Sequence, residues 1–229
     1  MDYILMGIKE AIALLTSFDR EVYSVVGRSL LVSGMATVLS SLYSIPIGLY
    51  LGIRELKGRR HISRLIYTGM SVPSVIVGLI VAIVLARRGP LGDLKLMYTV
   101  NAMIIAQTVL LTPLQVGLSY SLARNSGKRI KNTGTTLGGG NFDIVKLIIS
   151  ELRPQLMINV ITAFSRAISE VGAVMIVGGN IKGYTRVITT SITMFNSMGE
   201  YPMAIALGIV LLVLSFGVNS VVYSYNTEE

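Results

Sequence analysis

Long apolar segments alternate with short polar connections along most of the chain. Each apolar segment holds about 20 residues, which is the length that a helix needs to cross the hydrocarbon core of a bilayer. The pattern therefore predicts an all-α integral membrane protein with five transmembrane helices. The predicted spans cover residues 30–53, 65–86, 100–122, 156–179 and 203–225.

The N-terminal residues 1–18 follow a different pattern. Apolar side chains recur at helical spacing, whereas Lys9 and Glu10 fall on the opposite side. This arrangement is typical of an amphipathic helix at the membrane surface, and a short sixth span remains the alternative. A cleavable signal peptide is not expected, because Asp2 occupies the place of its basic region. The apolar positions are Ile4, Leu5, Ile8, Ala11, Ile12 and Leu15.

Prolines lie inside three of the predicted spans. Pro46 and Pro113 predict kinks in the first and third spans, and Pro73 interrupts the second span within Ser71–Ser74. A proline removes one helical hydrogen bond, which neighbouring helices of a bundle can replace. Bent helices occur in pores and transporters and also in static bundles, so the prolines leave both classes open.

Two charged side chains lie inside the fourth predicted span. Arg166 and Glu170 are four residues apart and are therefore expected on one face of a helix. Ionised groups at this depth usually face the bundle interior or a water-filled path. The pair either fixes helix packing or lines or latches a route for a polar solute. We take Pro73, Arg166, Ser169, Glu170 and Gly172 as candidate residues of a translocation path or helix latch.

The segment 124–154 is polar, basic and rich in glycine, although apolar segments flank it on both sides. Asn132 and Thr133 are suited to cap a short helix, which the glycines at 138–140 would end. Phe142 begins a renewed apolar pattern and would anchor this helix on the membrane domain. Connections of this length are usually functional or disordered. The apolar pattern favours a docking element that lies parallel to the membrane and contacts a partner.

Composition supports the membrane class. Only 14% of the 229 residues are charged, whereas a soluble domain carries about 25%. The formal net charge is +8, but the basic residues cluster in connections, which indicates membrane orientation and not nucleic-acid binding. The same rule places connections 54–64 and 124–154 in the cytoplasm and connections 87–99 and 180–202 outside. The N-terminus is then outside and the C-terminus cytoplasmic.

The chain lacks the residue sets that catalysis and metal binding require. It has no cysteine and one histidine, His61, so thiol chemistry and a multi-histidine metal site within one chain are excluded. The phosphate-binding pattern GxxxxGK[ST] is absent. We therefore expect no catalytic residue, no metal and no cofactor bound by this chain, and we do not expect an enzyme.

The segment 132–154 resembles the conserved cytoplasmic loop of ABC-importer permeases, in which Glu-Ala-Ala is followed after three residues by glycine. Gly138 stands at the glycine, whereas Asn132, Thr133 and Gly134 stand at the Glu-Ala-Ala positions. Residues 71–92 and 165–192 resemble segments of oxyanion-importer permeases, and within them the run Gly178–Arg186 is most similar to the tungstate branch, followed by molybdate.

The resemblance implies an ABC type I importer permease-like fold: a single transmembrane permease domain over residues 1–229, with a cytoplasmic coupling loop at about 124–154. The implied location is the cell (cytoplasmic or inner) membrane. The implied partners are two copies of an ATP-hydrolysing subunit, an extracellular or periplasmic oxyanion-binding protein and a second copy of the chain. The residues expected to couple to the ATPase are Asn132, Thr133, Gly134, Thr135, Thr136, Leu137, Gly138 and Phe142.

The expected function is therefore that of a permease subunit that translocates an oxyanion, tungstate first, driven by ATP hydrolysis in partner subunits. Molybdate is the nearest alternative, and sulfate, phosphate or an amino acid would use the same mechanism. An ATP-independent channel or secondary transporter is the alternative from a different class. A structural scaffold fits poorly with Arg166 and Glu170 inside a span.

Overall fold

The computed structural model describes residues 2–16, 20–54 and 58–226, and all regular secondary structure in these ranges is helical. The ends of the predicted helix 1–18 and three residues of connection 54–64 lie outside the described residues. The helices are α1 Asp2–Thr16, α2 Arg20–Ile53, α3 Arg59–Met70, α4 Ser74–Leu85, η1 Gly92–Leu94, α5 Val100–Leu122, η2 Ala123–Gly127, α6 Lys128–Thr136, α7 Asn141–Glu151, α8 Arg153–Ile168, α9 Gly172–Gly178, α10 Ile188–Ser197 and α11 Tyr201–Asn226.

Three described helices, 20–53, 100–136 and 201–220, are long and apolar enough to cross a membrane. Two bent pairs raise this number to five if each pair forms one span: α3 with α4, bent by 89°, and α8 with α9, bent by 58°. The structure therefore contains three of the five predicted spans as single helices and the other two as bent pairs. The break at Pro73 was expected, whereas the break between α8 and α9 was not.

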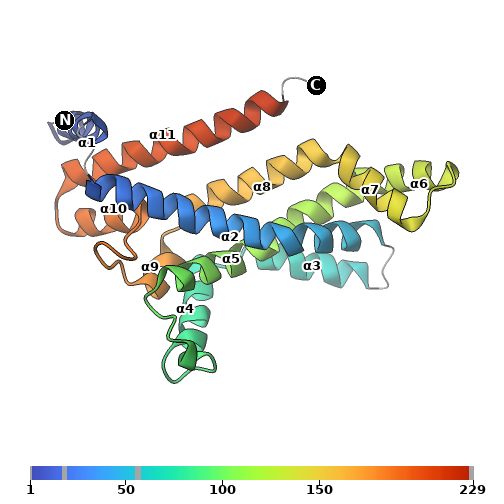
Figure 1. The fold of residues 1–229 in the computed structure, drawn as a ribbon, viewed down its shortest axis with the longest axis horizontal. Helices are drawn as coiled ribbons and strands as arrows, with labels where there is room; N and C mark the ends of the chain where they lie inside the picture. Colours follow the sequence, from blue (N-terminus) through green and yellow to red (C-terminus); the bar gives the residue numbers. More distant parts are fainter. Residues whose placement is uncertain (1, 17–19, 55–57, 227–229) are drawn as a thin grey trace.

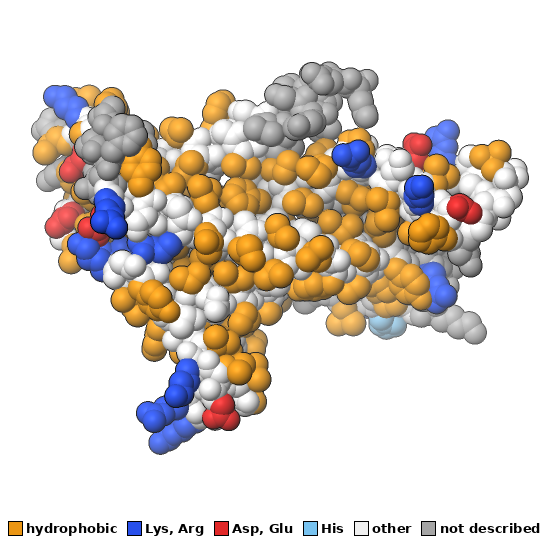
Figure 2. Space-filling view, viewed as in Figure 1, with side chains coloured by type: hydrophobic (Ala, Val, Ile, Leu, Met, Phe, Trp, Pro, Cys, Tyr) orange, Lys and Arg blue, Asp and Glu red, His pale blue; other side chains and the backbone are white. Residues whose placement is uncertain are grey.

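The four helices α2, α5, α8 and α11 run along the long axis of the molecule (Figure 1). A hairpin of α6 and α7 forms one end, and α1 and α10 lie near the other. Helix α4 projects sideways, away from the side on which α11 lies (Figure 1). Hydrophobic side chains cover the middle of the visible surface, and charged side chains gather at both ends and at the tip of α4 (Figure 2).

Helix α1 is not among the candidate spans. Its 15 residues would extend over about 22 Å, which is shorter than a hydrocarbon core of about 30 Å. The helix packs on α11 at Gly7, where a Cβ would collide with Ile205. Its apolar side chains Ile4, Leu5, Ile8 and Ile12 are exposed. The length therefore disfavours the sixth span, and placement on the membrane surface stays a prediction.

Helices α2 and α5 approach each other closely because α2 presents small residues to α5. A Cβ added at Gly48 would lie 2.7 Å from the Cβ of Ser119, and one added at Gly52 would lie 2.6 Å from the Cβ of Ala123. Small residues at every fourth position let helix backbones approach closely in membranes. Helix α2 begins at Arg20, ten residues before the predicted span, and it continues through Pro46.

The segment 124–154 is not the polar loop that its composition suggested. Helix α5 continues through the π-helical turn of η2 into α6, so residues 100–136 form one helix of 37 residues. A π turn accommodates an extra residue while keeping backbone hydrogen bonds, which lets the helix proceed. Asn132 and Thr133 consequently lie inside α6 and do not cap it. The predicted helix end at Gly138 is confirmed by its left-handed φ of 78°.

Candidate functional site

The two broken spans contact each other at their breaks. Gly172 begins α9, and a Cβ at this position would lie 2.7 Å from Cγ2 of Val75 and 3.3 Å from Oγ of Ser74. Both of these residues follow Pro73 directly at the start of α4. A Cβ at Gly78, one turn further along α4, would lie 2.6 Å from Cα of Ala173. The structure thus brings Pro73 and Gly172 together, where two bent helices cross at backbone distance.

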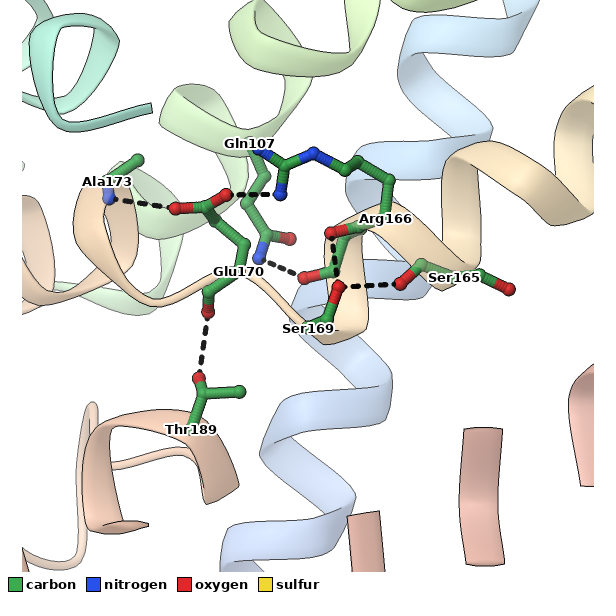
Figure 3. Close-up of polar contacts among 8 residues, drawn as sticks. Gln107, Ser165, Arg166, Ser169, Glu170, Ala173 and Thr189 are labelled. Carbon is green, nitrogen blue, oxygen red and sulfur yellow. Dashed lines mark hydrogen bonds and ion pairs between the residues drawn. The ribbon is translucent and has the colours of Figure 1, made fainter. Parts of the chain in front are cut away.

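Arg166 and Glu170 form the ion pair that their spacing predicted. Nη1 of Arg166 lies 2.6 Å from Oε2 of Glu170, and the side chains are 44% and 2% exposed, respectively (Figure 3). Glu170 lies beyond the last residue of α8, so the pair spans the break. Because the carboxylate neutralises the guanidinium, Arg166 is not an unpaired ligand for an anion in this conformation.

Glu170 also connects the break to two further helices (Figure 3). Its Oε1 accepts a hydrogen bond of 3.3 Å from the backbone N–H of Ala173 in the first turn of α9. A carboxylate is favoured there, because the first N–H groups of a helix lack intrahelical partners. The backbone carbonyl of Glu170 accepts from the hydroxyl of Thr189 on α10, at 2.8 Å. One residue therefore joins α8, α9 and α10.

Gln107 on α5 reaches the same place (Figure 3). Its Nε2 donates to the carbonyl of Ala167, at 3.0 Å, and its Oε1 is buried without a hydrogen-bond partner among the described residues. A cavity of about 10 Å³ next to it has room for about one water molecule. The sequence offered one signal for Gln107, a polar side chain in an apolar span, and none for Thr189. The polar lining of the cavity is Ser29, Ser33, Gln107, Glu170 and Thr189.

Ser169 contributes to the break through its own helix. Its hydroxyl donates to the carbonyls of Ser165, at 2.9 Å, and Arg166, at 3.1 Å (Figure 3). The hydroxyl of Ser165 in turn donates to Oδ1 of Asn219 on α11, at 3.3 Å. The polar groups of this region thus bind one another across five helices, α5 and α8 to α11. Such a network can hold the angle between α8 and α9, and its hydrogen bonds would have to rearrange if that angle changed.

The hairpin of α6 and α7 holds all eight predicted coupling residues. Its turn is built by glycines: the N–H of Gly139 donates to the carbonyl of Gly134, at 3.0 Å, and the N–H of Gly140 donates to the carboxylate of Asp143, at 3.0 Å. Gly134 is the one buried residue of α6, and a Cβ there would lie 3.3 Å from both Ile144 and Leu147. Close packing of two helices therefore fixes the hairpin.

The tip of the hairpin exposes large apolar side chains. Leu137 is 80% exposed and Phe142 is 81% exposed. The expectation that Phe142 anchors the hairpin on the membrane domain is therefore wrong, because its side chain points away from the core. The anchors are Ile144 and Ile148 of α7, which are buried in one apolar cluster with Leu49 of α2 and Leu156 of α8.

The threonine hydroxyls of α6 are occupied within the helix. Thr133, Thr135 and Thr136 donate to carbonyls four residues earlier, at 3.2, 2.8 and 3.0 Å, respectively. Asn132 is exposed on the same helix. The surface that a partner would meet is therefore the apolar tip together with the exposed side of α6.

Residues 44–226 match the family described as binding-protein-dependent transport system inner membrane component. The chain is 58% identical over 228 residues to the tungstate uptake system permease protein TupB of Peptoclostridium acidaminophilum, covering 100% of both proteins. It is 41% identical over 202 residues to a probable anion ABC transporter permease protein of Haloferax volcanii, covering 86% of this chain and 87% of that protein.

The fold is similar to that of a solved ABC transporter. The structure is a bacterial alginate ABC transporter in complex with a periplasmic protein that carries an alginate pentasaccharide. The TM-score is 0.70 at 17% identity, and the match covers 98% of this chain and 85% of the other chain. The expected type I importer permease-like architecture is thereby confirmed.

Proposed function

The chain belongs to the family of binding-protein-dependent transport system inner membrane components, and on this premise we propose that it is the permease subunit of a tungstate-importing ABC transporter. The observation that carries the proposal is the 58% identity, over the full length of both proteins, to a tungstate uptake permease. A permease for molybdate or another oxyanion is the second candidate, favoured by the similarity to a probable anion permease.

The hairpin of each copy is the proposed contact with one of two ATP-hydrolysing partner subunits. Leu137 and Phe142 supply an exposed apolar tip, which fits a hydrophobic groove on a partner protein. The helix 100–136 extends from this hairpin to Gln107, at the break between α8 and α9. A push on the hairpin would therefore move a continuous helix that ends among the broken spans. This is a rigid-body change of packed helices, and no chemical step in this chain is needed.

The crossing of α4 and α9 is the proposed moving part of the translocation path. Pro73 and Gly172 divide the two spans there, and the ion pair of Arg166 with Glu170 latches one of the bends. Opening the path would change the angle between α8 and α9, and it would separate Glu170 from Thr189 or Ala173. Because Glu170 neutralises Arg166, selectivity for the anion would reside mainly in an external binding protein.

A second copy of the chain would cover α4. This helix projects from the bundle (Figure 1), and its side chains Val75, Ile76, Leu79, Ile80 and Ile83 are 47–59% exposed. A continuous apolar helix face of this kind is typical of a protein or membrane contact. We propose that two copies pack at α4 around a central path, with the hairpin in the cytoplasm and loop 180–187 outside.

The function is tested by reconstituting the permease in lipid vesicles with the ATPase and binding protein encoded beside it. Tungstate is expected to stimulate ATP hydrolysis at a lower concentration than molybdate, and sulfate and phosphate are expected to have no effect. A response to phosphate without a response to tungstate or molybdate would refute the proposed substrate. Anion flux through the permease without any ATPase would instead identify a channel or secondary transporter.

A further inference from the structure

A groove of about 470 Å³ lies between α2, α7 and α8. Its volume is within the range of about 300–1,000 Å³ that small-ligand sites occupy. Apart from Tyr50, Arg54 and Lys131, every described residue that lines it is apolar. The interior therefore offers contacts to a hydrocarbon chain and almost no hydrogen-bonding groups.

The charged groups of the groove are both cations. Arg54 at the end of α2 and Lys131 on α6 are its charged lining residues among the described positions, and both are exposed. The guanidinium of Arg54 lies 4.8 Å from the ring centre of Tyr50, a cation–π contact that holds it beside the groove. Such a rim attracts an anionic group and repels a cationic one. The groove thus combines an apolar interior with a positive edge.

We propose that this groove binds an anionic phospholipid, with an acyl chain between α2 and α7 and the phosphate on Arg54 and Lys131. The end of a membrane-spanning helix followed by basic residues is the depth at which lipid headgroups lie. Anionic lipids of the inner leaflet are attracted to basic side chains at this depth. The charge and shape of the groove therefore both match one class of molecule.

The two other expected occupants have better surfaces elsewhere. The apolar tip proposed to meet the ATPase consists of Leu137 and Phe142, neither of which lines the groove. The helix proposed to meet a second copy is α4, which supplies no lining residue either. A protein segment that contacted the edge of the groove as well as its interior would need acidic groups opposite Arg54 and Lys131.

A lipid in the groove would affect the coupling of ATP hydrolysis to transport, an expectation that rests on the proposed function. Leu49 of α2 and Ile148 of α7 belong to the cluster that anchors the hairpin, and both also line the groove. A lipid chain there would support the hairpin from the membrane side. The ATPase activity of the assembled transporter is therefore expected to be higher in phosphatidylglycerol than in phosphatidylcholine.

The proposal is tested by native mass spectrometry of the purified permease in detergent with equimolar phosphatidylglycerol and phosphatidylcholine. The wild type is expected to retain phosphatidylglycerol preferentially. Arg54→Gln combined with Lys131→Gln is expected to lower this preference about tenfold, because each cation contributes to lipid attraction. The matched control is Arg87→Gln with Arg88→Gln beyond the end of α4, which removes the same charge outside the groove and is expected to keep the preference.

A second variant tests the acyl-chain contact. Ile149 lines the groove and is 47% exposed, so Ile149→Trp fills the space with little disturbance of the core. This variant is expected to retain less of both lipids. Equal phosphatidylglycerol retention by wild type, charge variant and Ile149→Trp would overturn the proposal. A disulfide between two copies of the variant Val145→Cys would also overturn it, because Val145 lines the groove and a second copy would then occupy it. No nucleotide or tungstate is present, so the result is independent of whether the proposed transport function holds.

Discussion

Glu170 was predicted to pair with Arg166 within one span, but it also contacts residues of α9 and α10. Its carboxylate binds Arg166 and the N–H of Ala173, and its carbonyl binds Thr189. Hydrogen bonds that involve a charged group contribute about 1.5–3 kcal/mol each. If the ion pair exists in only one of two transport conformations, its loss shifts their populations by about tenfold or more.

We therefore predict that Glu170→Gln lowers tungstate-stimulated ATP hydrolysis by the assembled transporter about tenfold. Arg166→Gln is expected to have a similar effect, and the double variant should be little worse than either single variant, because the pair acts as a unit. The measurement is steady-state ATP hydrolysis in vesicles with saturating binding protein. Additive losses in the double variant would show that the two residues act separately.

At the scale of elements, the contact of α4 with α9 depends on the absence of side chains. A Cβ at Gly78 would lie 2.6 Å from the backbone of Ala173. The crossing therefore tolerates no larger residue unless the helices separate. The break in the second span lies at a proline, Pro73. The break in the fourth span has no proline and lies where the carboxylate of Glu170 accepts a hydrogen bond from Ala173 in the first turn of α9.

Gly78→Ala is predicted to destabilise the protein by about 1–3 kcal/mol, the range for overpacking a close contact. The matched control is Gly34→Ala on α2, because a Cβ there meets nothing within 4 Å and alanine is favoured over glycine in helices. The measurement is size-exclusion chromatography of the detergent-solubilised protein after heating. The quantity compared is the temperature at which the monodisperse peak falls to half of its height. A control that is destabilised as much as Gly78→Ala would contradict the packing argument.

The hairpin gives a prediction that separates coupling from stability. Leu137→Ser with Phe142→Ser removes two apolar side chains that are 80% and 81% exposed, so thermal stability should be unchanged. Co-purification of the ATPase with the permease is expected to fall sharply. Leu212→Ser with Phe216→Ser on α11 is the control, with side chains 70% and 76% exposed at another site. Unchanged co-purification of the hairpin variant would remove it as the docking element.

Gly138 offers a second test of the hairpin, through its backbone. Its φ of 78° strains most side chains, although no atom lies within 4 Å of an added Cβ. Gly138→Asn should retain most coupled ATP hydrolysis, because asparagine tolerates the left-handed conformation, and Gly138→Val should lose most of it. Equal activity of both variants would show that the turn conformation is not required.

At the scale of the whole molecule, the visible surface is apolar in the middle and charged at its ends (Figure 2). This distribution fits a bundle that crosses the bilayer along its long axis. Helix α4 does not follow the long axis but projects sideways from the bundle (Figure 1). Its exposed side chains are large and apolar. The exposed apolar side chains of α4 fit the proposed packing against a second copy of the chain.

The orientation can be tested directly because the chain has no cysteine. Leu137→Cys in the hairpin is expected to react with an impermeant thiol reagent only after the cytoplasmic side is opened. Tyr184→Cys, at a side chain that is 50% exposed in the connection before α10, should react in intact cells. Reversed labelling would invert the predicted topology.

The sequence alone determined which segments are long and apolar enough to form spans, because about 20 apolar residues are needed wherever a helix meets lipid. It also determined the break at Pro73, the pairing of Arg166 with Glu170 and the helix end at Gly138. Each of these follows from local chemistry: a missing N–H, a four-residue spacing or a left-handed φ. The family resemblance added the partners and the substrate, which remain proposals.

Only the tertiary structure decided which distant residues meet. Gln107 lies on α5, Glu170 in the break between α8 and α9, and Thr189 on α10. No local pattern specifies that these three residues share one small cavity. The segment 124–136 was predicted to be a polar loop with a separate short helix parallel to the membrane. It instead continues α5, because backbone hydrogen bonds continue through a π turn, whatever the polarity of the side chains. Phe142 was misplaced for a related reason: an apolar residue is buried only if the packing of neighbouring elements turns it inward, and here Ile144 and Ile148 occupy that side.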